Sequence, residues 1–175
     1  LGYPTYGRGW TGVVNNNNGF NQTYTGLSAG SWEQGMYDYK AIIDTLIPAG
    51  YKVFWDSAAQ QSYLWSAAKQ EMVAFDDALT VYTKAQYVNQ KGLGGLMTWE
   101  ASGDTGITRS DNLLNVARVV LNSFDNSRNN LYYPTSTFTN INNMPNDAGA
   151  GPVPEPAKPV IVLPVPTPTP VPTPT

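Results

Sequence analysis

A glycine-rich apolar segment, residues 92–104, limits the possible folds of this chain more than any other stretch. It reads Gly-Leu-Gly-Gly-Leu-Met-Thr-Trp-Glu-Ala-Ser-Gly-Asp, and its apolar residues are Leu93, Leu96 and Met97. They do not alternate with polar residues, which is typical of a strand buried on both faces in a parallel sheet. The segment then changes to Trp99, Glu100 and Asp104. Because parallel α/β folds place their chemistry at the carboxyl ends of strands, the sequence predicts a functional site there.

The composition excludes several kinds of chemistry. The chain contains no cysteine and no histidine, which removes disulfides, thiolate nucleophiles, histidine bases and nearly every zinc site. Acid–base chemistry must therefore use carboxylates or tyrosines. The net charge is −3 and the sequence has no basic patch, so we predict no nucleic-acid partner. We also predict no cofactor and no metal site.

The C-terminal residues 151–175 form a segment rich in proline and threonine, and we expect the foldable part to end near Pro145. The composition predicts a disordered, extended, polyproline-like linker. Its apolar run 160–163 is far too short to cross a bilayer, so no membrane partner is predicted. Linkers of this kind usually connect modules of secreted enzymes, and Asn21-Gln22-Thr23 is a glycosylation sequon. The sequence therefore favours an extracellular protein with a further module beyond the linker.

Local patterns predict the elements of the first half of the chain. A short strand is expected within residues 1–6, followed by a polar loop around 15–19. A helix is expected from Ser31 to Leu46, with Gln34 completing a capping box and Pro48 and Gly50 ending it. Three aromatic and β-branched runs then predict an antiparallel meander, with a helix at 58–69 as the alternative. The runs are 51–55, 61–65 and 71–75.

Two further helices complete the pattern. Asp76 or Asp77 can cap a helix that runs to about Gln90 and ends at Gly92. A last helix, capped by Asp111, is expected to extend to Phe124 because its apolar residues recur at helical spacing. The order is strand, small α+β insertion, helix, strand, helix, which corresponds to two βα units of a barrel. A complete barrel typically has about 250 residues, and two parallel strands leave open edges, so we expect partners outside this sequence.

Four segments together resemble the glycoside hydrolase family 18 chitinases, over residues 1 to about 124. They are Tyr6-Gly7-Arg8-Gly9-Trp10, Gly35-Met36-Tyr37-Asp38-Tyr39, Phe75-Asp76-Asp77 with Lys84, and residues 92–104. The resemblance implies an α/β fold, a partial (β/α)8 TIM barrel of the last two βα units with an inserted α+β domain. It assigns residues 1–10 to barrel strand seven and its loop, 11–75 to the chitinase insertion domain, 76–128 to a barrel helix, strand eight and the last helix, 129–150 to a C-terminal loop and 151–175 to the linker.

The same resemblance implies an activity and a partner. Family 18 chitinases hydrolyse β-1,4-linked N-acetylglucosamine polymers with retention by a substrate-assisted mechanism, so the implied partner is chitin or a chito-oligosaccharide. It also implies that the further module beyond the C-terminus is a carbohydrate-binding module. The family's general acid ends an Asp-x-x-Asp-x-Asp-x-Glu run that this sequence lacks. We therefore assign no catalytic residue and expect the chain alone to be inactive.

Other functions remain open at this point. Within the family, the alternatives are a non-hydrolytic, lectin-like chitin-binding protein and an endo-N-acetylglucosaminidase acting on peptidoglycan or glycoproteins. A purely structural or interaction protein is the remaining class.

The resemblance also assigns substrate-binding residues. Trp99 matches the tryptophan at the floor of the cleavage subsite, Arg8 offers a donor fork for sugar hydroxyls or a carboxylate, and Tyr6 lies beside it. The alternatives are a core role for Trp99 and, for Arg8, an ion pair with Glu100 or Asp104. We expect Glu100 to orient its neighbours rather than to catalyse.

The remaining aromatic and acidic residues have plainer interpretations. Trp32, Trp55 and Trp65 could line an extended polysaccharide, but aromatic residues at strand and helix spacing are usually core, and we favour core for most of them. Asp76 and Asp77 are expected to cap a helix rather than to contact substrate.

Overall fold

The computed structural model describes residues 1–121, 132–139, 151, 159–165 and 167–169. The chain divides into two compact units, Leu1–Asn122 with Pro159–Thr175, and Ser123–Lys158. All elements and sites below belong to the first unit. The end of the predicted last helix at Phe124 and most of the predicted loop 129–150 lie outside the described residues.

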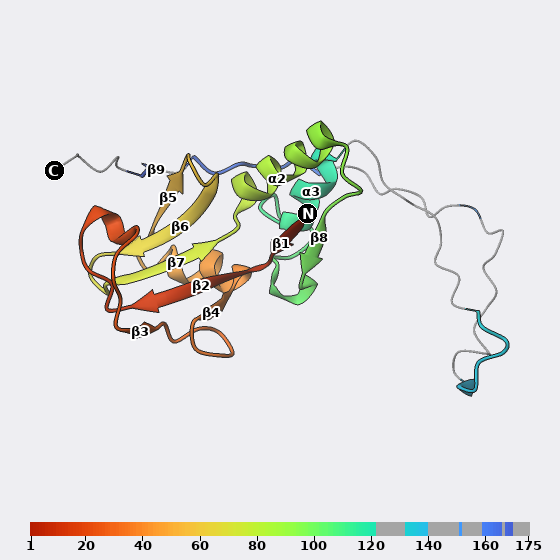
Figure 1. Cartoon of the computed structure of the whole chain (residues 1–175), viewed down its shortest axis with the longest axis horizontal. Coiled ribbons are helices and arrows are strands. Elements are labelled where there is room, and N and C mark those ends of the chain that lie inside the picture. Colours follow the sequence, from red (N-terminus) through yellow and green to blue (C-terminus); the bar gives the residue numbers. More distant parts are fainter. Residues whose placement is uncertain (122–131, 140–150, 152–158, 166, 170–175) are drawn as a thin grey trace. The chain divides into compact units, whose positions relative to one another are not determined.

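A pair of parallel strands forms one part of the first unit (Figure 1). β1 (Gly2–Pro4) runs parallel to β8 (Met97–Trp99), with Gly2 opposite Met97 and Pro4 opposite Trp99. Two helices, α2 (Ala78–Lys91) and α3 (Leu113–Val120), pack against each other beside them. Within the described residues no other strand joins this pair and no closed barrel forms.

An antiparallel sheet forms the other part. Its strand order is β3-β2-β7-β6-β5-β9, and β4 also pairs with β2. The bounds are β2 Tyr6–Thr11, β3 Gly26–Leu27, β4 Met36–Asp38, β5 Lys52–Asp56, β6 Gln61–Ser66, β7 Glu71–Phe75 and β9 Thr167–Pro168. The meander predicted from the three runs is confirmed as β5, β6 and β7, and the alternative helix at 58–69 is wrong.

Strand β2 corrects the sequence prediction for the Tyr-Gly-Arg segment. This segment is not a parallel barrel strand, because β2 pairs antiparallel with β4 and β7. Its glycines face inward: a Cβ on Gly7 would lie 2.7 Å from Val73 Cγ1, and one on Gly9 would lie 2.4 Å from Ser28 Oγ. Because side chains alternate along a strand, Tyr6, Arg8 and Trp10 share the outer face. The parallel strand is instead β1, earlier in the chain.

The helix predicted from Ser31 is wrong for its first half. Gly30 and Gly35 both have positive φ, 76° and 77°, and the intervening residues form a turn closed by a hydrogen bond from Ser31 N to Met36 O (2.7 Å). β4 follows this turn. Helical structure begins only at α1 (Tyr39–Ala41) and continues through the π-helical η2 (Ile42–Leu46). It ends before Pro48 and Gly50, as predicted.

Capping side chains fix the starts of the two longer helices. Asp77 caps α2, since its carboxylate accepts a hydrogen bond from Thr80 N (2.9 Å), and Gly92 ends the helix at φ 60°. Both assignments follow the prediction. The cap of α3 is Asn112 rather than Asp111: its Oδ1 accepts from Asn115 N (2.9 Å). Short turns η1 (Asn17–Gly19) and η3 (Ala101–Gly103) complete the elements.

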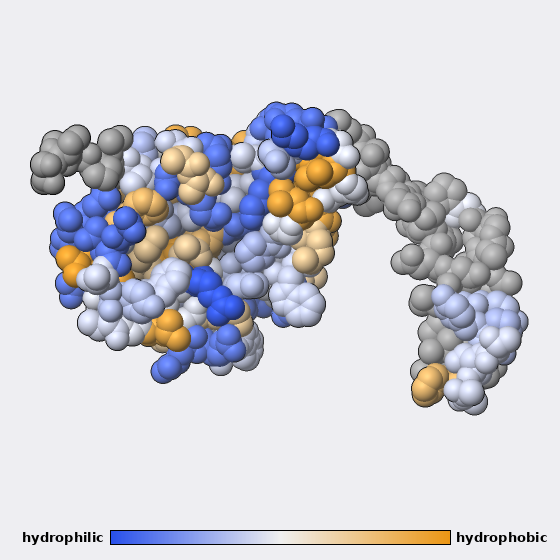
Figure 2. Space-filling model, in the orientation of Figure 1, coloured by the Kyte–Doolittle hydropathy of each residue, from blue (hydrophilic) through white to orange (hydrophobic). Residues whose placement is uncertain are grey.

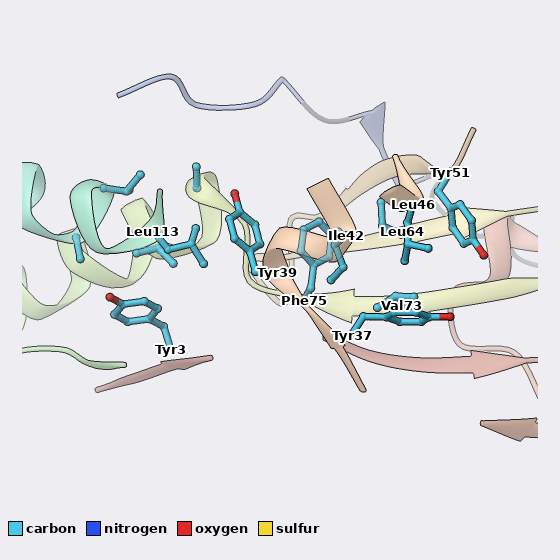
Figure 3. Packing of buried hydrophobic residues seen from close by; sticks show 14 residues of the cluster. Tyr3, Tyr37, Tyr39, Ile42, Leu46, Tyr51, Leu64, Val73, Phe75 and Leu113 are labelled. Carbon is cyan, nitrogen blue, oxygen red and sulfur yellow. The ribbon is translucent and has the colours of Figure 1, made fainter. Parts of the chain in front are cut away.

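The main hydrophobic core extends from the parallel strands to the antiparallel sheet (Figure 3). Tyr39, Ile42 and Phe75 occupy its middle, between Leu113 on one side and Leu64 on the other. A second cluster packs on the opposite face of the antiparallel sheet. Its buried members are Val13, Phe54, Tyr63 and Trp65, with Trp10, Phe20 and Met72 packed against them.

Strand β8 is more exposed than its sequence predicts. Met97 is 58% exposed and Leu93, before the strand, 43%, although the pattern predicted burial on both faces; only Leu96 of the three packs against the main core. The physical reason is that β8 has only β1 as a neighbour among the described strands, so its other edge and much of its apolar surface are uncovered.

Part of the C-terminal segment is folded, which corrects the prediction of a disordered linker for residues 159–165 and 167–169. Ile161 and Leu163 pack against the main core, and Val162 N donates to Ser110 O (3.2 Å). β9 then extends the antiparallel sheet by pairing parallel with β5. Apolar contacts and backbone hydrogen bonds are therefore enough to order proline-rich sequence here. Among the described residues, no helix is long and apolar enough to cross a membrane.

Candidate functional site

A groove of about 250 Å³ lies where the carboxyl end of β8 meets the antiparallel sheet. It is lined by Thr5, Tyr6, Arg8, Trp32, Glu33, Met36, Asp38, Trp99, Glu100 and Gly103. All three residues predicted to bind substrate, Trp99, Arg8 and Tyr6, contribute to it. The fold brings them together because β1 pairs with β8 and leads within two residues into β2.

Trp99 is the last residue of β8, and its backbone is firmly held. Thr5 N donates to Trp99 O (3.0 Å), and Thr5 Oγ1 donates to the carbonyl of Glu100. Gly103 packs so closely that a Cβ there would lie 2.5 Å from Thr5 O. The peptide bond between Trp99 and Glu100 is cis. The side chain of Trp99 is nevertheless 66% exposed, so the alternative core role is wrong and an aromatic surface is open to a ligand.

Arg8 lies on the outer face of β2 with few constraints. Its guanidinium stands 5.4 Å from the centre of the Tyr6 ring and 3.8 Å from Glu33 Oε1. Both members of this ion pair are more than half exposed, so the pair contributes little stability. Neither Glu100 nor Asp104 forms an ion pair with Arg8. Most of its five N–H groups therefore remain able to donate to a ligand.

The two acids considered as alternative partners of Arg8, Glu100 and Asp104, have other roles. Asp104 accepts hydrogen bonds from Leu113 N (3.0 Å) and Leu114 N (3.1 Å), at the start of α3. Burial raises the pKa of Asp104, and these backbone donors oppose the rise. Glu100 accepts a hydrogen bond from Ser102 Oγ (2.5 Å), as expected for a residue that orders its neighbours.

Trp32 is a groove residue for which the sequence favoured a core position, with a polysaccharide-lining role as the alternative. It lies in the turn before β4 and is 84% exposed, so the core interpretation is wrong for this residue. Its Nε1–H donates to Asp38 Oδ2 (3.0 Å), which fixes the indole on the side of the groove. Its position between Gly30 and Gly35, among polar residues, was the available signal for an exposed turn. The core interpretation is confirmed for Trp65, which is buried.

The buried acids at the start of α2 support the fold. Asp76 forms an ion pair with Lys84 and accepts from Gln61 Nε2 (3.1 Å). Asp77 accepts from Ser62 Oγ (2.7 Å) in addition to its capping bond. Neither lines the groove. Within the part of the chain that the structure describes, no three acidic, histidine or cysteine side chains are placed to hold a metal ion.

The groove thus combines two exposed indole rings, a guanidinium and three carboxylates. Flat aromatic faces suit the apolar face of a sugar ring, and the charged groups can donate to or accept from hydroxyls. The family model described as "Glycosyl hydrolases family 18" matches residues 1–104, which include every groove residue. The chain belongs to this family.

Relatives of this family 18 chain are chitinases by name. It is 42% identical over 115 residues to "Chitinase A1" of Niallia circulans, covering 65% of this chain and 16% of the relative. It is 38% identical over 141 residues to "Chitinase 1" of Aphanocladium album, covering 81% and 31%. The chain therefore spans less than a third of the length of these curated relatives.

Solved structures agree with this assignment. Chitinase ChiA74 from Bacillus thuringiensis superposes with a TM-score of 0.60 at 30% identity, covering 69% of this chain and 22% of that one. A variant of the class V chitinase from Nicotiana tobaccum, in complex with NAG4, gives 0.59 at 25% identity and covers 70% and 34%. The resemblance inferred from the sequence motifs is thus confirmed.

Proposed function

We propose that this family 18 chain forms part of the substrate cleft of a secreted chitinase and binds a polymer of β-1,4-linked N-acetylglucosamine. The observation that carries the proposal is the exposure of Trp99 at the end of β8, in the same groove as Trp32 and Arg8. The chitinase names of its relatives support the substrate class. The sequon at Asn21 and the proline- and threonine-rich C-terminal segment favour secretion.

Four of the groove residues have a defined part in the proposed binding. The indole of Trp99 stacks on the apolar face of one pyranose ring, and burial of both surfaces supplies the free energy. The indole of Trp32 provides a second face at the side of the groove. Arg8 donates to hydroxyl or acetamide oxygens, and Glu33 accepts from hydroxyls. These contacts hold a sugar chain without altering it.

Bond cleavage needs groups that this sequence does not contain. In the proposed substrate-assisted mechanism, the acetamide oxygen of the sugar attacks its anomeric carbon while a glutamic acid protonates the leaving oxygen, and configuration is retained. The acidic run that carries this acid is absent from the sequence. The exposed apolar surface around Met97 and Leu93 suits packing against further βα units. We expect the polypeptide alone to bind sugar without hydrolysing it.

A binding titration tests this proposal. N-acetylchitobiose and N-acetylchitohexaose are titrated into the full chain by calorimetry, with Trp99→Ala as the test variant. Loss of the stacked ring should weaken binding of both sugars at least about tenfold. Tyr87→Ala is the matched control, because Tyr87 is an exposed aromatic residue of α2 that does not line the groove.

Two results would contradict the proposal. Unchanged affinity of the Trp99→Ala variant for both sugars would show that Trp99 does not bind the sugar. Release of product from a chromogenic chito-oligosaccharide by the purified chain would contradict the expectation of inactivity.

A further inference from the structure

A second groove, of about 260 Å³, lies on the antiparallel sheet beside the site already described. Two aromatic side chains and two amide side chains form its walls, and two apolar side chains of β7 lie at its base. These residues are Trp10, Tyr24, Asn21, Gln22, Met72 and Ala74. None of its lining residues is charged, so it suits a neutral ligand.

Strand register places this groove next to the first one. Arg8 lies opposite Ala74 and Trp10 lies opposite Met72, so Ala74 at the base of the second groove neighbours Arg8 in the first. Tyr6, Arg8 and Trp10 share the outer face of β2 and span about 13 Å along it at about 3.3 Å per residue. Figure 2 shows apolar side chains reaching the surface over β6 and β7 on this part of the molecule.

The aromatic pair combines a ring that packs on the core with a ring that is exposed. The Trp10 and Tyr24 rings stand 6.1 Å apart at 51°, so they form an angled wall. Trp10 is fixed because it packs against the second hydrophobic cluster. Tyr24 is 55% exposed, and its hydroxyl has no hydrogen-bond partner among the described residues.

The amide of Gln22 is also oriented. Its Nε2 donates to Phe20 O (3.0 Å), which leaves its carbonyl oxygen without a donor among the described residues. The groove therefore presents aromatic faces, a free hydroxyl and a free acceptor without any charge. Hydroxyl and acetamide groups on a ring with an apolar face match all of these features.

We propose that the groove at Trp10 and Tyr24 is a second subsite for the same N-acetylglucosamine chain, several sugar rings from Trp99. This inference rests on the proposed function. A sugar chain stacked on Trp99 would pass Arg8 and follow β2 to the second groove, in contact with the sheet surface throughout. Short oligosaccharides occupy only one groove, whereas long ones occupy both and gain affinity because the second contact is intramolecular.

The test compares ligand length between two variants of the full chain. Calorimetry with N-acetylchitobiose and N-acetylchitohexaose is run on Tyr24→Ala and on Trp99→Ala, with Tyr87→Ala as control. Tyr24→Ala should weaken binding of the hexasaccharide about three- to tenfold and leave the disaccharide unchanged. Gln22→Ala should have the same length dependence with a smaller effect. Thermal unfolding of each variant verifies that the fold is intact.

The outcomes separate this inference from the proposed function. If Trp99→Ala weakens both sugars and Tyr24→Ala weakens neither, the second subsite is wrong and the proposed function stands. If Tyr24→Ala weakens both sugars equally, the groove is not a remote subsite. If Trp99→Ala has no effect while Tyr24→Ala weakens the hexasaccharide, the assignment of the first site is wrong and only the second groove binds.

Discussion

In β6, Leu64 is fully buried and its neighbours Tyr63 and Trp65 are nearly so, whereas in β8 Met97 and Trp99 are more than half exposed. Both strands are rich in apolar and aromatic residues. The difference is that β6 has β5 and β7 on its two edges and a hydrophobic cluster on each face, while β8 has only β1 among the described strands. Burial depends on the neighbours of a strand as well as on its own composition.

The two regions also differ in what they contribute, because one supplies mainly stability and the other mainly an exposed binding surface. The antiparallel sheet and residues 39–51 together contain eight of the fourteen buried side chains of the main core, and the sheet also carries the second cluster, so this part should dominate the free energy of unfolding. The end of β8 contributes the exposed indole of Trp99, which costs little to the fold if removed. The groove forms where a well-buried sheet meets a sparsely covered strand.

The largest expected effect is the difference in unfolding free energy between truncations in β6 and in β8. Leu64→Ala should lower the free energy of unfolding by about 2–5 kcal/mol, because it leaves a cavity in the main core. Met97→Ala, the matched change in β8, should cost less than about 1 kcal/mol because that side chain is mostly in water. Urea unfolding followed by tryptophan fluorescence measures both. Equal losses would mean that β8 is covered in solution.

A smaller effect should appear in the pH dependence of stability. Burial raises the pKa of Asp77 above its ordinary value of 3.8, against the opposing hydrogen bonds from Thr80 and Ser62. The folded state then keeps this proton to a higher pH than the unfolded state. The stability contributed by Asp77 is therefore fully present below pH 3.8 and is lost as the pH rises through the folded-state pKa.

Comparison with Asp77→Asn isolates this dependence, because asparagine can still cap α2. Wild type should lose stability relative to the variant as pH rises above about 4, by about 1.4 kcal/mol per unit of raised pKa. Urea unfolding of both proteins at a series of pH values measures the difference. A relative gain by wild type over that range would show that the hydrogen bonds outweigh burial.

The smallest effect concerns the C-terminal segment, which adds to the antiparallel part. Leu163→Ala should lower the free energy of unfolding by up to about 1 kcal/mol, since Leu163 is partly buried against the main core. Val160→Ala is the control and should have almost no effect, because Val160 is mostly exposed. If thermal unfolding does not distinguish the two variants, the packing of Leu163 against the main core contributes nothing to stability.

Local sequence signals correctly predicted the elements whose formation depends on residues close by in the sequence. The meander followed from β-branched and aromatic runs between turn residues, and α2 from the Asp77 cap and the Gly92 terminator. The region between Gly30 and Gly35 was misjudged, because the spacing of Trp32 and Met36 also fits a helix. There the positive φ of both glycines and the pairing of β4 with β2 decided the structure.

The sequence by itself determined the family and the placement of Trp99 at a strand end, since both depend on short contiguous motifs. It also predicted Arg8 and Tyr6 as substrate-binding residues, and both line the groove. Only the tertiary structure decided that Trp32 joins them, that Arg8 faces Glu33 rather than Glu100, and that Trp10 opens a second groove. These outcomes depend on strand register and on contacts between residues far apart in the chain, and no local pattern encodes either.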